Sequence, residues 1–115
     1  MPTHVGDETC PACVVAGDFI FLAHHGGGFE HDDVAAQLRA ALERMRETLE
    51  SVGASLDDMV QLNLYLKHVY DFEPARDVFP EFFKNGFPAR MTTVTEFIDQ
   101  ACLCQIDGMA YKARG

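Results

Sequence analysis

One arginine in this 115-residue chain stands where its side chain would be held rigidly enough to bind a ligand. Arg90 follows Phe87, Pro88 and Ala89 and opens a predicted strand. Because proline restricts the backbone just before it, the guanidinium can be positioned to grip a carboxylate through two hydrogen bonds. The alternative is an ordinary surface arginine in an ion pair.

Four polar residues in two groups could contribute acid-base or hydrogen-bonding chemistry. Gln105 and Asp107 share one face of the last predicted strand, where they either line a pocket or face solvent. His24 and His25 precede three glycines and could form an acid-base pair or bind a metal. The alternative is a pair of solvated loop histidines, because no phosphate-binding fingerprint accompanies the glycines.

The four cysteines fall into two closely spaced pairs, Cys10/Cys13 and Cys102/Cys104. The first pair has the spacing of half a zinc site or of a redox motif. A redox motif belongs at the start of a helix, however, and this pair leads into a predicted strand. Zinc would need both pairs, and two thiols on one side of a strand suit tetrahedral closure poorly. We therefore expect free thiols and no bound metal.

The composition indicates a single domain over residues 1–115 with a substantial core. Apolar residues make up 48% of the chain and nine residues are phenylalanine, which excludes intrinsic disorder. Eighteen acidic and nine basic residues give a net charge of −9, which argues against nucleic acids and anionic membranes as partners. The sequence has no apolar run long enough for a bilayer and no secretory signal, so we expect a cytoplasmic location.

Hydrophobic spacing predicts the elements that would position these residues. After a polar lead-in at residues 1–11, the predicted order is strand, strand, helix, strand, helix, strand, strand. The ranges are a hairpin of strands 14–16 and 19–23, a helix over 34–52, a strand over 59–67, a helix opened by Asp71, and strands 91–97 and 101–111. This order predicts an α+β fold with a mixed sheet and both helices on one face. The other face of the sheet must also be buried, and another subunit is the simplest cover.

The first helix and the strand after it have the clearest patterns. The helix carries one apolar stripe, with Asp32 and Asp33 as candidate N-caps and Gly53 as its stop. In the strand, apolar and polar residues alternate, so that the apolar ones all point one way. These apolar residues are Val60, Leu62, Leu64 and Leu66. In the second helix, Pro80 is expected to cause a kink or an early end.

Four segments, in this order and spacing, resemble the Rid family, also called the YjgF family. The segments are GDFIFLA, the long stretch DDVAAQLRAALERMRETLESVGASLDDMVQLNLYLKHVYDF, FPAR and CLCQIDGMAY. The resemblance covers about residues 14–112. It implies a chorismate-mutase-like α+β fold, with a mixed sheet of six-stranded type and two helices on one face, that assembles as a homotrimer with pockets between subunits.

The resemblance also implies roles for individual residues. Arg90 corresponds to the arginine that binds a substrate carboxylate, and Phe87 of the same FPAR element is expected to line the substrate site. Gln105 stands where RidA-type members have a glutamate that positions or activates the attacking water. Ala23 and His24 stand where those members have Ser-Gly. We expect Ala23 to contact substrate, and His24, or alternatively His25, to take over proton transfer. A glutamine holds water but accepts no proton at neutral pH.

The function that the resemblance implies is hydrolysis of reactive imines and enamines of 2-oxo acids to the oxo acid and ammonia. Family members need no cofactor or metal, and the implied partner is a small carboxylated imine, enamine or 2-oxo acid. The alternative is a non-catalytic carboxylate-binding or stress-linked interaction trimer. An endoribonuclease or translation inhibitor fits a charge of −9 least well. Among the departures from the family pattern, Arg76 stands where an asparagine is common.

Overall fold

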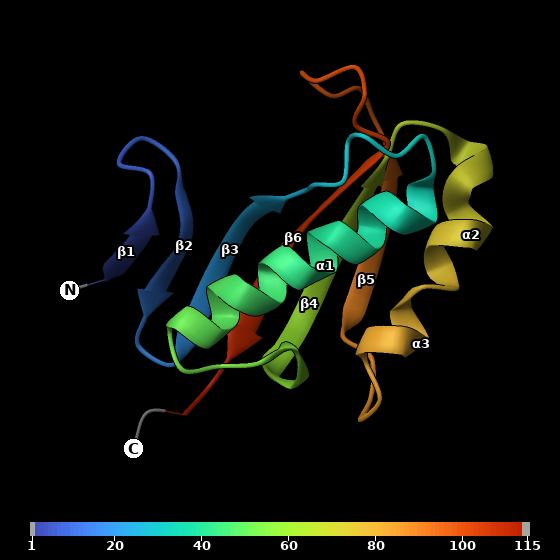
Figure 1. The fold of residues 1–115 in the computed structure, drawn as a ribbon. Coiled ribbons are helices and arrows are strands. Elements are labelled where there is room, and N and C mark those ends of the chain that lie inside the picture. Colours follow the sequence, from blue (N-terminus) through green and yellow to red (C-terminus); the bar gives the residue numbers. More distant parts are fainter. Residues whose placement is uncertain (1, 114–115) are drawn as a thin grey trace.

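A computed structural model describes residues 2–113 as one mixed six-stranded sheet with its helices on one face (Figure 1). In chain order the elements are β1 (Thr3–Gly6), β2 (Pro11–Ala16), β3 (Phe19–His25), α1 (Val34–Ser51), η1 (Leu56–Asp58), β4 (Met59–Leu66), η2 (Val69–Asp71), α2 (Phe72–Arg76), α3 (Phe79–Phe82), β5 (Ala89–Val94) and β6 (Cys104–Tyr111). The strand order across the sheet is β1-β2-β3-β6-β4-β5. Only β4 and β5 are parallel among these pairs, because α2 and α3 form the crossover between them. The predicted α+β fold with a mixed sheet is confirmed.

The hairpin between β2 and β3 forms as predicted, with Ala16 opposite Phe19 across a two-residue turn. The prediction that residues 1–11 are only a lead-in is wrong, because β1 pairs with β2 along the edge of the sheet. This edge strand has a weak sequence pattern: Val5 is its one half-buried residue and the rest of the strand is exposed.

The main helix, α1, begins and ends where the capping residues predicted. Asp33 is the N-cap and accepts a hydrogen bond from the backbone N–H of Ala36 at 3.1 Å. Gly53 follows the helix at a φ of +81°, a conformation that glycine adopts without steric cost. The apolar stripe packs on the sheet, and Leu38, Leu42 and Met45 are fully buried.

A buried amide, which the apolar pattern did not reveal, fastens α1 to two loops. The Gln37 Nε2 group donates to the carbonyl oxygens of His31 at 2.8 Å and Ala101 at 2.9 Å, and its Oε1 accepts from the N–H of Leu103 at 2.7 Å. Every polar atom of this side chain is therefore paired. The loop that contains His31 and the loop that contains Ala101 and Leu103 are therefore both held to the helix by this one residue.

Strand β4 is present, but the prediction that Val60 points the same way as Leu62 and Leu64 is wrong. A bulge between Met59 and Gln61 shifts the alternation by one residue, so Met59 is buried while Val60 is 46% exposed. Next to the bulge, Gly108 pairs with Leu62 and lies so close to β4 that an added Cβ would stand 2.2 Å from the Gln61 carbonyl oxygen.

The second predicted helix is two short ones, α2 and α3, with a break before Pro80. Pro80 lies in the first turn of α3, where its missing N–H costs nothing, and it could not have continued α2. The last two strands also differ from their predicted ranges: β5 runs from Ala89 to Val94 and β6 begins at Cys104.

The face of the sheet away from the helices carries exposed apolar side chains. Phe19 and Phe21 are 42% and 45% exposed, Tyr111 is 44% exposed, and the ring centres of Phe19 and Tyr111 lie 5.3 Å apart. Their strand neighbours Ile20 and Leu22 point the other way into the core. Among the helices of the described chain, none combines the length and apolarity that crossing a membrane would need.

Candidate functional site

Arg90 lies on β5 against an aromatic wall. It pairs in register with Leu62 of β4, whose side chain is buried under the helices, so Arg90 points to the helical side of the sheet. Its guanidinium carbon lies 5.3 Å from the ring centre of Phe79 and 5.6 Å from that of Phe72. Within residues 2–113, no carboxylate lies within ion-pair distance of this guanidinium. The arrangement therefore differs from a surface ion pair and leaves the hydrogen-bonding edge of the arginine open.

A cavity of about 410 Å³ opens beside this guanidinium. It is lined by Leu62, Arg76, Asp77, Phe79, Pro80, Phe87, Pro88 and Arg90. We call it the arginine cavity. Two of the residues that the sequence proposed for substrate binding, Arg90 and Phe87, thus lie together.

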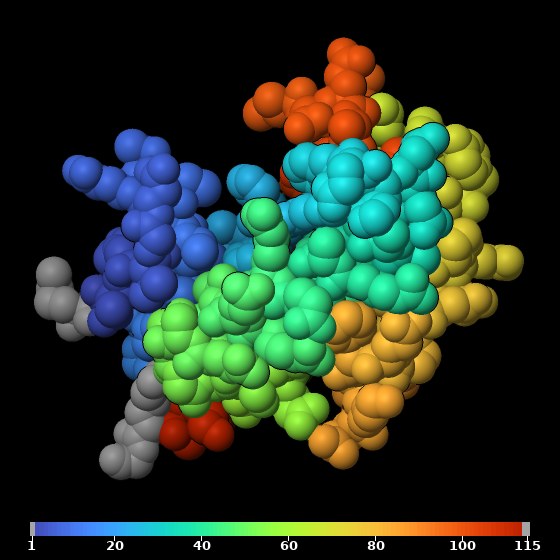
Figure 2. Space-filling model, viewed as in Figure 1, coloured from blue at the N-terminus to red at the C-terminus, as the bar shows by residue number. Residues whose placement is uncertain are grey.

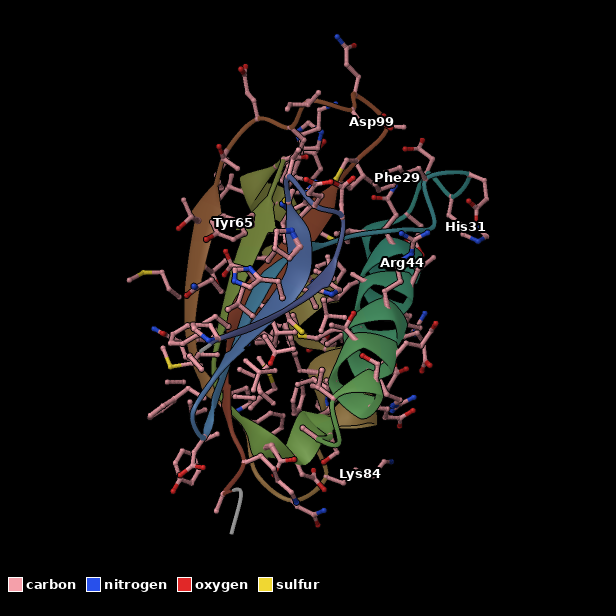
Figure 3. All side chains as sticks on the ribbon, turned by 90° about the vertical axis from the view of Figure 1, so that its left-hand side faces the viewer. Phe29, His31, Arg44, Tyr65, Lys84 and Asp99 are labelled. Carbon is pink, nitrogen blue, oxygen red and sulfur yellow. The ribbon has the colours of Figure 1, made fainter. Side chains whose placement is uncertain are left out.

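The other three proposed residues, Ala23, His24 and Gln105, line a different cavity of about 760 Å³. It lies between the β1–β2 hairpin, the end of β3 and α1, and we call it the hairpin cavity. Figure 2 shows the surface hollowed between the N-terminal strands and α1. Figure 3 views the molecule from the hairpin side and labels Phe29 and Arg44, which also line this cavity.

Arg90 and Gln105 point to opposite faces of the sheet, although α1 contributes Arg44 to the cavity that Gln105 lines. Gln105 pairs with Tyr65 of β4, and its neighbours Cys104 and Ile106 are buried beneath the helices, so Gln105 points away from them. Arg90 points toward the helices. A single chain therefore does not present Arg90 and Gln105 to one small ligand.

The two histidines differ sharply in their surroundings. The sequence placed both in a flexible loop, but β3 continues to His25, with an irregularity in its pairing to β6 after Leu22. His24 is exposed and lines the hairpin cavity, whereas His25 is only 7% exposed. Both ring nitrogens of His25 are engaged, with Nδ1 at 2.7 Å from the Ala23 carbonyl oxygen and Nε2 at 2.9 Å from Thr48 Oγ1.

The contact to Ala23 fixes one proton of the His25 ring. A carbonyl oxygen only accepts, so Nδ1 donates to it, while Nε2 faces a Thr48 hydroxyl that also contacts the Arg44 carbonyl oxygen at 3.2 Å. Burial lowers the pKa of His25 below its ordinary value of 6.5, against a smaller raising effect of the bond to Ala23. His25 is thus a structural link between β3 and α1, and His24 is the histidine whose side chain is exposed at the hairpin cavity.

We expect this buried histidine to make the fold sensitive to acid. Its pKa is lower folded than unfolded, so the stability that it contributes is complete above about pH 6.5 and is lost as the pH falls below that value. The free energy of unfolding should fall by at most ~1.4 kcal/mol per pH unit from this group. Urea unfolding of the wild type and His25→Gln at pH 7.5, 6.5 and 5.5 measures the difference.

The control is His4→Gln, which removes an exposed histidine from β1. A pH dependence as steep in His25→Gln as in the wild type would contradict this account. So would an NMR titration in which the His25 ring takes up its proton at or above its ordinary pKa.

Asp107, on the same face as Gln105, is held by two neighbours on β4. The Asn63 Nδ2 group donates to one carboxylate oxygen at 2.8 Å and the Tyr65 hydroxyl donates to the other at 2.9 Å. Burial, followed by the bond to Asp107, raises the pKa of Tyr65. Asp107 is therefore part of a cross-strand network and not an isolated solvent-facing carboxylate.

The four cysteines are free thiols in the structure, with Cys10 exposed and the other three buried. Burial raises the pKa of Cys104 to about 12, and it also raises the pKa of Cys13 and Cys102. Thiols with raised pKa values are poor nucleophiles at neutral pH. In the part of the chain that the structure describes, no three His, Cys, Asp or Glu side chains are grouped as a metal ion would require.

The fold and the site define a class of small α+β domains: a six-stranded mixed sheet with helices on one face and an arginine on its parallel edge strand. The family model described as Endoribonuclease L-PSP matches residues 10–112. The chain therefore belongs to this family, the YjgF/RutC family, and the resemblance found in the sequence is confirmed.

Individual relatives agree with this assignment. A RutC family protein from Pyrococcus horikoshii is 31% identical over 105 residues, which cover 86% of this chain and 83% of the relative. The structure of a yjgF family protein from Streptococcus pyogenes M1 GAS superimposes with a TM-score of 0.90 at 28% identity, covering 98% of each chain. A human protein named 2-iminobutanoate/2-iminopropanoate deaminase is 26% identical over 77 residues, or 67% of this chain and 56% of the relative.

Proposed function

We propose that this protein hydrolyses reactive imines of small 2-oxo acids, with Arg90 holding the substrate carboxylate. In this reaction water adds to the imine carbon, and the resulting tetrahedral carbon expels its nitrogen as ammonia to leave the 2-oxo acid. A protonated imine is already electrophilic, so the reaction needs positioning and one oriented water more than strong acid-base chemistry. No metal or cofactor is needed for such a step.

The observation that carries the proposal is the unpaired guanidinium of Arg90 over two aromatic rings. Within residues 2–113 this arginine has no carboxylate partner, so beside a cavity with several apolar walls it is poised to take its partner from a ligand. A bidentate bond to the carboxylate would orient the adjacent imine carbon. The name of the human relative, a 2-iminobutanoate/2-iminopropanoate deaminase, supports a substrate of this class.

The proposal requires a second copy of the chain, because Arg90 and Gln105 face opposite sides of one sheet. We infer a homotrimer in which the arginine cavity of one subunit meets the hairpin-cavity edge of the next, where Gln105 would hold the water and His24 would move its proton. The exposed apolar residues of the open sheet face supply a surface for such an assembly.

Two measurements on the purified protein test this. Sedimentation should give a species of three 12.8 kDa chains, and a stable monomer would overturn the shared site. Ammonia release from freshly generated 2-iminopropanoate should be faster with the protein than without it.

A second candidate function, carriage of a small carboxylate without catalysis, is favoured by the glutamine at position 105, which cannot act as a base. Binding of 2-oxo acids with no acceleration of ammonia release would support it. The family description names an endoribonuclease, but a net charge of −9 disfavours a phosphate-rich ligand.

A further inference from the structure

The arginine cavity contains a second cation that the reaction above does not use. Arg76, the last residue of α2, lines the same cavity as Arg90. The guanidinium carbon of Arg76 lies 5.7 Å from the ring centre of Phe72, and that of Arg90 lies 5.6 Å from the same centre. Because both distances end at the same ring centre, the separation of the two guanidinium carbons cannot exceed the sum of these two distances. A four- or five-carbon ligand with a carboxylate at each end can bridge that span.

The positive charge of this cavity is poorly compensated by the protein itself. Within the described chain, one carboxylate lines the cavity, that of Asp77. Its Oδ1 lies 3.3 and 3.4 Å from two nitrogens of Arg76, and the Asp77 side chain is 71% exposed. Strong charge-assisted bonds are shorter, about 2.7–2.9 Å. Asp77 is therefore a weak partner that a ligand carboxylate can replace, and Arg90 has no partner to lose.

The other walls of the cavity are apolar, with Leu62, Phe79 and Phe87 among them. Such walls suit the short hydrocarbon chain between two carboxylates and lower the local dielectric, which strengthens each ion pair. They offer little to a ligand with several hydroxyls. In a chain of net charge −9, this pair of arginines is a local exception that favours anions.

We propose that the arginine cavity selects dicarboxylates, the 2-imino or 2-oxo acids of four or five carbons with a second, distal carboxylate. Arg90 holds the carboxylate next to the reacting carbon and Arg76 holds the distal one. This inference rests on the role proposed for Arg90 and adds the class of substrate. Arg76 is then a specificity-determining residue that touches the ligand away from the reacting atoms.

The test compares two ligands that differ only at the far end. 2-Oxoglutarate and 2-oxopentanoate have the same chain length, but the second has a methyl group in place of the distal carboxylate. By isothermal titration calorimetry, the wild type should bind 2-oxoglutarate ~10- to 30-fold more tightly, as one partly exposed charged contact allows. Arg76→Gln should bring that ratio of affinities close to one.

The matched control is Arg46→Gln. Arg46, on α1, also stacks on a phenylalanine, with its guanidinium carbon 5.1 Å from the ring centre of Phe82, but it lies outside the arginine cavity. The Arg46→Gln substitution removes the same charge, and it should leave the ratio of the two affinities as in the wild type. Equal wild-type affinities, an unchanged ratio in Arg76→Gln, or no binding of either ligand would overturn the proposal.

The proposed function fails or survives separately in this design. A dicarboxylate preference without faster ammonia release from 2-iminoglutarate would remove the catalytic role and leave the selective site. Faster ammonia release from 2-iminopropanoate without any preference for 2-oxoglutarate would keep the catalytic role and overturn the dicarboxylate selectivity.

Discussion

Replacing Arg90 by alanine is expected to abolish the binding of small 2-oxo acids while the protein stays folded. The side chain is exposed and has no ion pair within the residues that the structure describes, so its loss breaks no such pair and opens no core cavity. Loss of a bidentate charge-assisted contact in a partly dry cavity should cost ~2–4 kcal/mol, or about thirty- to a thousand-fold in affinity. Calorimetric titration with 2-oxobutanoate measures the effect, and circular dichroism checks the fold.

Two further variants separate charge from geometry at this position. Arg90→Lys keeps the positive charge but loses the planar fork, so its affinity should fall between those of the wild type and the alanine variant. Arg46→Ala removes an arginine that also stacks on a phenylalanine, outside the cavity, and should bind as the wild type does. Undiminished binding of 2-oxobutanoate by Arg90→Ala would show that this guanidinium is a surface group.

Placing a glutamate at position 105 is expected to raise the rate of imine hydrolysis. Gln105 can orient a water through hydrogen bonds but cannot remove its proton, whereas a carboxylate can do both. Gln105→Glu should therefore increase turnover of 2-iminopropanoate by ~10²-fold or more, the low end for a general base. The gain should appear only above the pKa of the new carboxylate, where the group is ionised. Ammonia release between pH 5 and 8 provides the profile.

Gln61→Glu is the matched control, because it adds the same charge at an exposed position on β4 outside the hairpin cavity. A high wild-type rate that falls in Gln105→Glu would mean that glutamine serves a different substrate. If neither form accelerates ammonia release while 2-oxo acids still bind through Arg90, the catalytic proposal is wrong and the carrier remains.

Elements with strong local signals were predictable from the residues alone. The helix α1 combines an apolar stripe, an aspartate cap and a terminal glycine, and the β2–β3 hairpin has a two-residue turn; each signal acts within a few residues. The first strand was missed because its order comes from pairing with β2 and not from its own apolar residues. The exposure of Val60 was missed for a related reason, since a bulge depends on the opposing strand.

The sequence by itself determined which side chains can do chemistry, where α1 lies and which family the chain resembles. Only the tertiary structure decided which of those side chains meet. Arg90 is in register with Leu62, and Gln105 is in register with Tyr65, three residues farther along the same strand, β4. Side chains alternate across a sheet with a period of two residues, so an odd offset puts the two groups on opposite faces. That register is set by pairing between strands far apart in the chain, and no local pattern of residues encodes it.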